Sequence, residues 1–187
     1  MQPRTLLEAL SVAERLKDTT RHSYTTKGRH ESVAEHSWMA ALMAYFIADE
    51  FPEADMNKVI KMCLIHDLGE AFTGDIPTFD KTKENEETEE TLLNEWVDSL
   101  PENYANEMRA LYEEMTKRET LEAKIYKAID NLEAVVQHNV ADISTWIPME
   151  YELNQSYGYD KVAFSEYLLK LRDEIKMDTL QKIKEKS

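Results

Sequence analysis

Apolar residues recur at intervals of three and four along most of the chain, the spacing that places them on one face of a helix. The pattern predicts a first helix over about residues 4–17. Its inward face is expected to carry Leu6, Leu7, Leu10 and Leu16. A second helix is expected to begin after Ser32, where Glu35 completes a capping-box pattern, and to run to about Glu50. Because this segment is apolar almost all round, we expect a central, buried helix.

The same periodicity predicts helices over the rest of the chain. They are expected over about residues 56–70, 81–100, 103–116 and 119–141, with a last amphipathic helix after a turn at 156–160. The helix at 119–141 carries an apolar stripe formed by Leu121, Ile125, Ala128, Leu132 and Val135. We find no strong strand signal, internal repeat or linker. The fold class predicted is therefore all-α, with residues 1–187 forming a single domain.

The composition agrees with this prediction. The 187 residues are 42% hydrophobic and 32% charged, which is typical of a globular protein with a real core. The counts of Gly 4 and Pro 5 are low, which disfavours a turn-rich all-β fold.

The charge and the single cysteine limit the partners and the location. A formal net charge of -15 makes binding to duplex nucleic acid through a basic face improbable. Cys63 is the only cysteine, so no intramolecular disulfide forms, as in proteins of a reducing cytoplasm. The N-terminus lacks the apolar centre of a signal peptide, and the apolar run 33–47 is too short and polar to span a bilayer. We expect a cytoplasmic protein that binds neither duplex nucleic acid nor membranes.

The segment "CLIHDLGEAFTGD" (63–75) places costly polar groups at the end of an apolar run. His66 shares a helix face with the preceding apolar residues, Asp67 lies on its flank, and Glu70 lies one turn beyond if the helix persists. A buried unpaired carboxylate costs several kcal/mol, whereas a divalent cation accepts neutral imidazole and carboxylate together. The alternative is an ordinary helix end, with Asp67 exposed and His66 packing or capping.

A second histidine strengthens the metal hypothesis. His36 lies on the predicted buried helix, which is apolar enough to pack in the same core as the helix that carries His66. A histidine satisfied within the core is the alternative for His36. Two buried histidines with a neighbouring Asp67 and Glu70 are also the composition of a metal site. The residues alone leave both readings open.

The stretch "RHSYTTKGRH" (21–30) is locally basic in an acidic chain. It holds Arg21, Lys27 and Arg29 and contains no acid. The stretch lies just before the His36 helix, so its side chains can line the same cavity. Arginine suits bidentate contact with phosphate, and the alternative is an exposed loop.

Three segments together resemble a known family, the HD-domain metal-dependent phosphohydrolases, and within it the 5′-deoxyribonucleotidase-like group. They are "ESVAEHS" (31–37), "LIHDLGEAFTGDIP" (64–77) and "KAIDNLEAVVQH" (127–138). The resemblance covers a motif-bearing core of about residues 5–140 and leaves a helical extension of about 141–187. It implies a single HD-domain helical bundle. Relatives commonly carry a tryptophan close behind the arginine of the basic stretch, where this chain has His22 and Tyr24.

The resemblance also implies the site. It gives one divalent metal four ligands, His36, His66, Asp67 and Asp130. Asp130 is a ligand on the resemblance alone, because a helical wheel places it nearly opposite the Leu132 stripe, where an exposed aspartate is expected. Glu70 and Asp75 match acidic residues that act on water or the leaving group. Arg21 matches a phosphate-binding residue, and Lys27 and Arg29 would help to attract the anion.

The function that follows is a phosphomonoesterase that removes the 5′-phosphate from (deoxy)ribonucleoside monophosphates. A mixed nitrogen and oxygen site is compatible with Mn, Co, Ni, Fe or Mg. The alternatives are a nucleotide pyrophosphohydrolase or triphosphohydrolase, and a non-catalytic helical binding module with a structural metal. The resemblance further implies a homodimer. Base and sugar preference, and the division of roles between Glu70 and Asp75, stay open.

Overall fold

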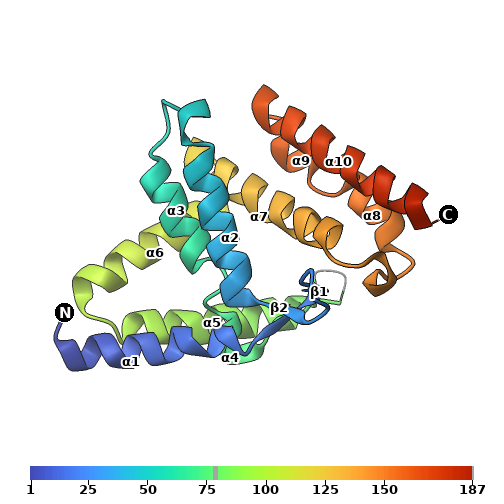
Figure 1. The fold of residues 1–187 in the computed structure, drawn as a ribbon. Coiled ribbons are helices and arrows are strands. Elements are labelled where there is room, and N and C mark those ends of the chain that lie inside the picture. Colours follow the sequence, from blue (N-terminus) through green and yellow to red (C-terminus); the bar gives the residue numbers. More distant parts are fainter. Residues whose placement is uncertain (78–79, 187) are drawn as a thin grey trace.

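The computed structural model describes residues 1–77 and 80–186, and Figure 1 shows a bundle of helices with one small hairpin. With η marking 3₁₀ helices, the first helices along the chain are α1 (Pro3–Ala13), η1 (Glu14–Lys17), α2 (Val33–Phe46), η2 (Ala48–Glu50), α3 (Met56–Ile65), α4 (Glu70–Thr73) and α5 (Lys83–Asp98). The later ones are α6 (Glu102–Lys117), α7 (Leu121–Val140), η3 (Ile143–Thr145), α8 (Glu150–Ser156), α9 (Tyr159–Val162) and α10 (Glu166–Lys186). The hairpin pairs β1 (Thr20–Tyr24) with β2 (His30–Ser32). The all-α prediction is confirmed.

Helix α7 is the centre of the arrangement. It packs against α2 and α3 on one side and against α10 on the other (Figure 1). The predicted apolar stripe of α7 is buried, with Ile125 and Leu132 fully enclosed. The facing side of α2 offers Ala40 and Ala44, both fully buried, and such small side chains let neighbouring helices approach closely. Each fully enclosed Leu or Ile contributes about 1.5–3 kcal/mol of burial free energy.

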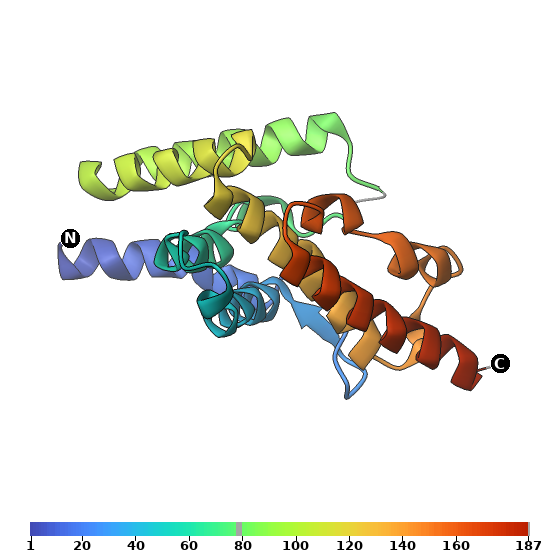
Figure 2. The ribbon, with the colours of Figure 1, turned by 90° about the horizontal axis from the view of Figure 1, so that it is seen from above.

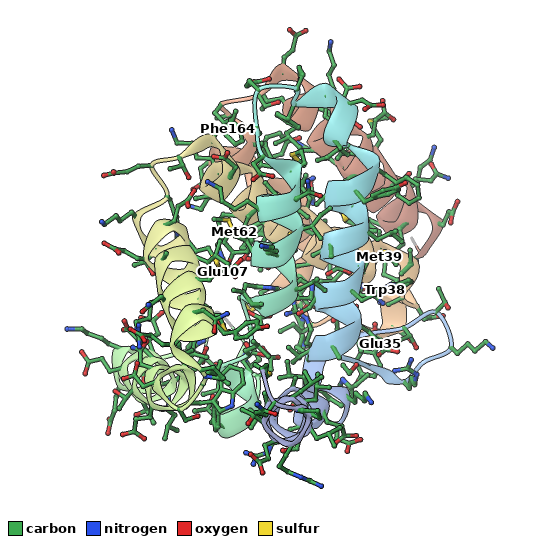
Figure 3. All side chains as sticks on the ribbon, turned by 90° about the vertical axis from the view of Figure 1, so that its left-hand side faces the viewer. Glu35, Trp38, Met39, Met62, Glu107 and Phe164 are labelled. Atoms are coloured by element: carbon green, nitrogen blue, oxygen red, sulfur yellow. The ribbon has the colours of Figure 1, made fainter. Side chains whose placement is uncertain are left out.

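Helix α2 starts as predicted but is not wholly buried. The Ser32 side chain accepts a hydrogen bond from the Glu35 backbone, and the Glu35 carboxylate accepts one from the Ser32 backbone, which confirms the capping box. One side of the helix faces solvent, with Trp38 57%, Tyr45 64% and Phe46 73% exposed. Trp38, labelled in Figure 3, lies on this exposed side. Apolar character all round the helix was therefore not a sign of burial on every side.

The first helix is also more exposed than its pattern indicates. Leu16 is buried, but the prediction that Leu6, Leu7 and Leu10 face inward is wrong, since they are 46%, 55% and 53% exposed. The residues that pack into the bundle belong to η1 and the end of α1, whereas the rest of α1 extends past α2 and α3 (Figure 2). Helical periodicity identifies an apolar face but not whether another element covers it.

Two predictions of local structure, at the end of α3 and in the basic stretch 21–30, are wrong. The helix expected over 56–70 ends at Ile65, and after a turn Glu70 begins the separate short helix α4. The basic stretch, in which we expected no strand, forms most of the hairpin, with Gly28 in its turn at a φ of 78°. These strands are short and polar, so they lack the apolar alternation by which a strand is usually identified.

None of the helices in the described part of the chain is both long and apolar enough to cross a membrane.

Candidate metal centre and adjoining cavity

Four side chains predicted as ligands converge where α2, the end of α3 and α7 meet. The Nε2 atom of His36 lies 3.2 Å from Nε2 of His66 and 3.2 Å from Oδ1 of Asp130. The Nε2 atom of His66 lies 3.0 Å from Oδ2 of Asp67. His36 is fully buried, and the side chains of Asp67 and Asp130 are 19% and 15% exposed. The packing of α7 thus brings Asp130 inward, against the exposed position that its helical wheel favours.

Both imidazole rings are held by their other nitrogen. The Nδ1 atom of His36 is hydrogen-bonded to the carboxylate of Glu133, and Nδ1 of His66 lies 2.8 Å from the carbonyl oxygen of Cys63. In a neutral ring each Nδ1–H donates to these acceptors, so the Nε2 lone pair points into the cluster. Glu133, which is fully buried, was not singled out from the sequence, although it lies one turn after Asp130. That spacing on a buried helix was the available signal.

The cluster fits a divalent cation. Ligand atoms that lie about 2.0–2.2 Å from one octahedral metal are about 3 Å apart. The Nε2 atoms of the two histidines lie 3.0 to 3.8 Å from the nearest carboxylate oxygens of Asp67 and Asp130. Without a cation, two imidazole lone pairs and two carboxylates would face each other at these distances, which is unfavourable. The mixed nitrogen and oxygen donor set is compatible with Mn, Co, Ni, Fe or Mg and argues only against a metal that prefers thiolate ligands. Metal binding by these residues stays a prediction.

The charges of the cluster reflect the same geometry. Burial lowers the pKa of His66, but Asp67 and Asp130 outweigh it and raise that pKa to about 10. Burial opposes the shift at Asp67, yet the two imidazoles hold its pKa below the usual range. Asp130 behaves likewise, because Lys127 and the imidazoles outweigh burial and lower its pKa. Protons therefore occupy the site when a cation does not, and binding a cation would release them.

Arg21 lies beside the cluster on β1. Its Nη1 atom is 3.6 Å from Oδ2 of Asp67, and its Nε atom is 3.3 Å from the carboxylate of Glu31. The Ser23 hydroxyl donates to the same Glu31 carboxylate at 2.9 Å. Burial, followed by the charge of Glu133, raises the pKa of Glu31 to about 7. Glu31 thus orients the guanidinium of Arg21 while its own charge is only partly developed at neutral pH.

The two candidate acid–base residues lie next to the cluster. Glu70 is 6% exposed, and with Asp75 it lines the same cavity as Arg21 and the two ligand carboxylates. Burial, then the charges of Asp67 and Asp75, raise the pKa of Glu70 to about 10. Burial raises the pKa of Asp75 as well, with Arg21 opposing the shift. A carboxyl group that keeps its proton at neutral pH can act as an acid.

The cavity continues away from the cluster and has a volume of about 550 Å³. Three lysines that the sequence analysis did not select line it, Lys81, Lys127 and Lys161. The Nζ atom of Lys127 lies 2.6 Å from Oδ2 of Asp130, one turn away on α7. Basic side chains therefore lie among the carboxylates that line the cavity, in spite of the acidic chain.

The structure does not bring Lys27 and Arg29 to the cluster. Both are exposed near the hairpin turn and outside the residues that line the cavity, and Arg29 pairs with Glu35. Of the three basic residues predicted for phosphate binding, the geometry favours Arg21 alone for direct contact.

Comparisons with known proteins point to one family. A family model described as HD domain matches residues 13–172. The chain is 30% identical over 138 residues to 5′-deoxynucleotidase HDDC2 of Homo sapiens, which covers 72% of this chain and 67% of that protein. It is 32% identical over 141 residues to 5′-deoxynucleotidase HDDC2 of Dictyostelium discoideum, covering 70% and 74%. The crystal structure of a predicted metal-dependent phosphohydrolase from Magnetospirillum magnetotacticum MS-1 matches with a TM-score of 0.82 and 26% identity, covering 96% and 93%.

Proposed function

Because the chain belongs to the HD domain family, we propose that it is a metal-dependent phosphohydrolase that removes the 5′-phosphate from deoxyribonucleoside monophosphates. The observation that carries the proposal is the convergence of four nitrogen and oxygen donors beside Arg21, at one end of a cavity. The named activity of the relatives supplies the substrate class.

Each residue of the site has a proposed role. His36, His66, Asp67 and Asp130 would hold one divalent cation, whose identity is open among Mn, Co, Ni, Fe and Mg. When bound, the ion would act as a Lewis acid that offsets the negative charge of the phosphate and lowers the pKa of a bound water molecule. Arg21 would hold phosphate oxygens through its planar guanidinium. Lys27 and Arg29 would act only at longer range, by attracting the anion.

The acid–base step requires a proton for the departing sugar oxygen as the phosphorus–oxygen bond breaks. The raised pKa of Glu70 favours it as the proton donor. Asp75, where the charge of Arg21 opposes the rise in pKa that burial causes, would then orient the attacking water. The water supplies a hydroxyl to phosphorus and a proton to a nearby base, so the products are phosphate and a nucleoside.

The direct test measures phosphate release from dAMP and dATP by the purified protein with each divalent ion in turn. We expect phosphate from dAMP and little reaction with dATP. Release of triphosphate or pyrophosphate from dATP would favour the pyrophosphohydrolase or triphosphohydrolase alternative. Bound metal without turnover of either nucleotide would favour the non-catalytic binding module.

Two variants separate metal binding from chemistry. Asp67→Asn should lose bound metal and activity together while its circular dichroism stays helical. Glu70→Gln should keep the metal and lose about 10²–10⁴-fold in rate, since an amide donates no acid proton. Full turnover by metal-free Asp67→Asn protein would refute the assignment of the site.

A homodimer is part of the proposal, with the exposed side of α2 as its interface. Trp38, Tyr45 and Phe46 form an apolar surface of the kind that association buries. Trp38→Glu should shift the protein from dimer to monomer in analytical ultracentrifugation. Met177→Glu, at a residue 63% exposed on α10, is the matched control and should leave the dimer intact. A monomeric parent protein would remove this part of the proposal.

The proposed location is the cytoplasm, supported by a single, buried and unpaired cysteine, Cys63. The net charge of -15 supports the further proposal that duplex nucleic acid is not a partner.

A further inference from the structure

Two helices form walls of the cavity that lead away from the cluster of candidate ligands. On α7 the lining residues are Lys127, Asp130, Asn131, Ala134, Val135 and His138, a spacing that follows one helix face. On α8 and just after it they are Glu150, Leu153, Asn154 and Tyr157, again one face. At a rise of 1.5 Å per residue, the wall extends about 12 Å from Asp130 to His138. This length leaves room for a sugar and a base beyond a phosphate held at the cluster.

On each of these walls, one polar atom of a buried asparagine lacks a partner within the described chain. Asn131 is 5% exposed and its Oδ1 atom makes no hydrogen bond to any described residue. Asn154 is 3% exposed, and its Nδ2 atom likewise makes no hydrogen bond to any described residue. Buried polar atoms are rarely left unpaired in a folded protein, because the lost solvation is not recovered. Since both residues line the cavity, the missing partner is expected in the cavity itself.

The turn at Gly158 packs against Asn131. Gly158, in the turn that follows α8, has a φ of 81°, which a residue with a side chain adopts only at a cost. A Cβ atom at Gly158 would also lie 3.2 Å from Cβ of Asn131. The turn therefore packs directly against Asn131 and limits the directions from which its oxygen can be reached.

The far end of the cavity is polar and fixed. The carboxylate of Glu150 is 2% exposed, with one oxygen 3.1 Å from Nε2 of His22 and 3.5 Å from Nε2 of His138. Its other oxygen accepts a hydrogen bond from the Ile147 backbone at 2.8 Å. Such a group suits the donor and acceptor edge of a nucleobase better than an apolar leaving group.

We propose that Asn131 and Asn154 form a nucleoside subsite, in which the Asn131 oxygen accepts from a sugar hydroxyl and the Asn154 amide donates to the sugar or base. The inference rests on the proposed function for the position of the phosphate. Asn131 follows Asp130 directly on α7 and is therefore the nearer of the two to the sugar. Helix α8, which lies outside the motif-bearing core, would then select nucleotides over other phosphomonoesters.

The test replaces each amide by a side chain of similar size, as Asn131→Leu and Asn154→Leu. The probes are deoxyadenosine and inorganic phosphate, whose binding is measured separately by calorimetry, and dAMP, whose hydrolysis gives a KM. We expect each variant to bind deoxyadenosine at least 10-fold more weakly and to show a KM for dAMP raised by a similar factor. Phosphate binding and thermal stability should not fall, because only an unpaired amide has been removed.

The matched control is Gln155→Leu, which removes an amide from the next residue of α8, where the side chain donates to the Tyr151 backbone outside the cavity. It should leave deoxyadenosine binding, phosphate binding, the KM for dAMP and thermal stability unchanged. Parent-like deoxyadenosine binding by both Leu variants, equal loss of phosphate binding, or no deoxyadenosine binding by the parent protein would overturn the subsite. The proposed function is judged independently, by whether the parent protein releases phosphate from dAMP.

Discussion

Glu133 illustrates how a single buried residue determines what the site can bind. Its side chain is fully buried and its carboxylate holds Nδ1 of His36, which leaves Nε2 directed at the other donors. A buried carboxylate without such a partner would be strongly unfavourable. In a neutral ring the pair therefore favours the tautomer that presents the Nε2 lone pair to a cation.

We expect Glu133→Gln to weaken metal binding by about 10–100-fold, because the amide keeps the shape but removes the charge that makes His36 a better donor. Metal titration followed by calorimetry measures this. Glu113→Gln, at an exposed residue of α6, is the matched control and should bind metal like the parent protein. Equal affinities for the two variants would show that Glu133 has no part in orienting His36.

At this scale the sequence indicated the candidate ligands better than the residues that support them. Buried spacing made His36, His66 and Asp67 candidates, the resemblance completed the set with Asp130, and all four come together. Glu133 and Lys127 lie one turn on either side of Asp130 but look like ordinary charged helix residues in the sequence. Their roles depend on which face of α7 the other helices cover, which is a tertiary fact.

Among the elements, α10 is held to the turns around α8 and α9 by one buried arginine. Arg172 is fully buried, and its guanidinium donates to the backbone oxygens of Tyr157 and Asn154, each at 2.8 Å. It also lies 4.7 Å from the centre of the Tyr159 ring. These contacts fix the segment that forms one wall of the cavity.

Arg172→Lys should lower the free energy of unfolding by about 2–4 kcal/mol, because lysine keeps the charge but cannot reproduce the two hydrogen bonds of the guanidinium. Urea denaturation measures the change. Lys170→Ala, which removes an exposed pair with Glu166 on the same helix, is the control and should have little effect. A parent-like midpoint for Arg172→Lys would show that these contacts do not stabilise the fold.

The elements themselves were predictable to different degrees. α6 and α7 match their expected ranges closely, because long amphipathic helices repeat their signal over several turns. The break between α3 and α4 was missed, since His66, Asp67 and Leu68 continue the helical pattern through a turn. The exposure of α1 could not be foreseen, because no sequence pattern states which apolar face finds a partner.

For the molecule as a whole, metal binding and folding are expected to be linked. The donors come from α2, from the end of α3 and from α7, the helices that also form the main core. Residues of the extension, such as Glu150 and Asn154, line the same cavity as Asp67. This sharing supports the proposal that residues 1–187 form one domain.

Cys63 gives a measure of this linkage. It is fully buried in the main core, and burial raises the pKa of its thiol, so a thiol reagent should label it only when the fold opens. At a metal concentration of about 100 times the dissociation constant, opening should become about 100-fold rarer and labelling slower by that factor. A chelator should restore the fast rate. Labelling that is rapid and indifferent to metal would contradict a buried, metal-linked core.

The wide separation of His36 and Asp130 along the chain, 94 residues, bears on how the protein is made. The ribosome has to synthesise α7 before Asp130 is present. A nascent chain that has emerged only as far as α6 therefore carries three of the four proposed ligands. Ions captured during translation would at that stage meet two imidazoles and one carboxylate without their fourth companion. If these four residues hold the ion as proposed, complete coordination would be confined to the final stage of synthesis or later, and a product terminated before α7 would lack the fourth ligand.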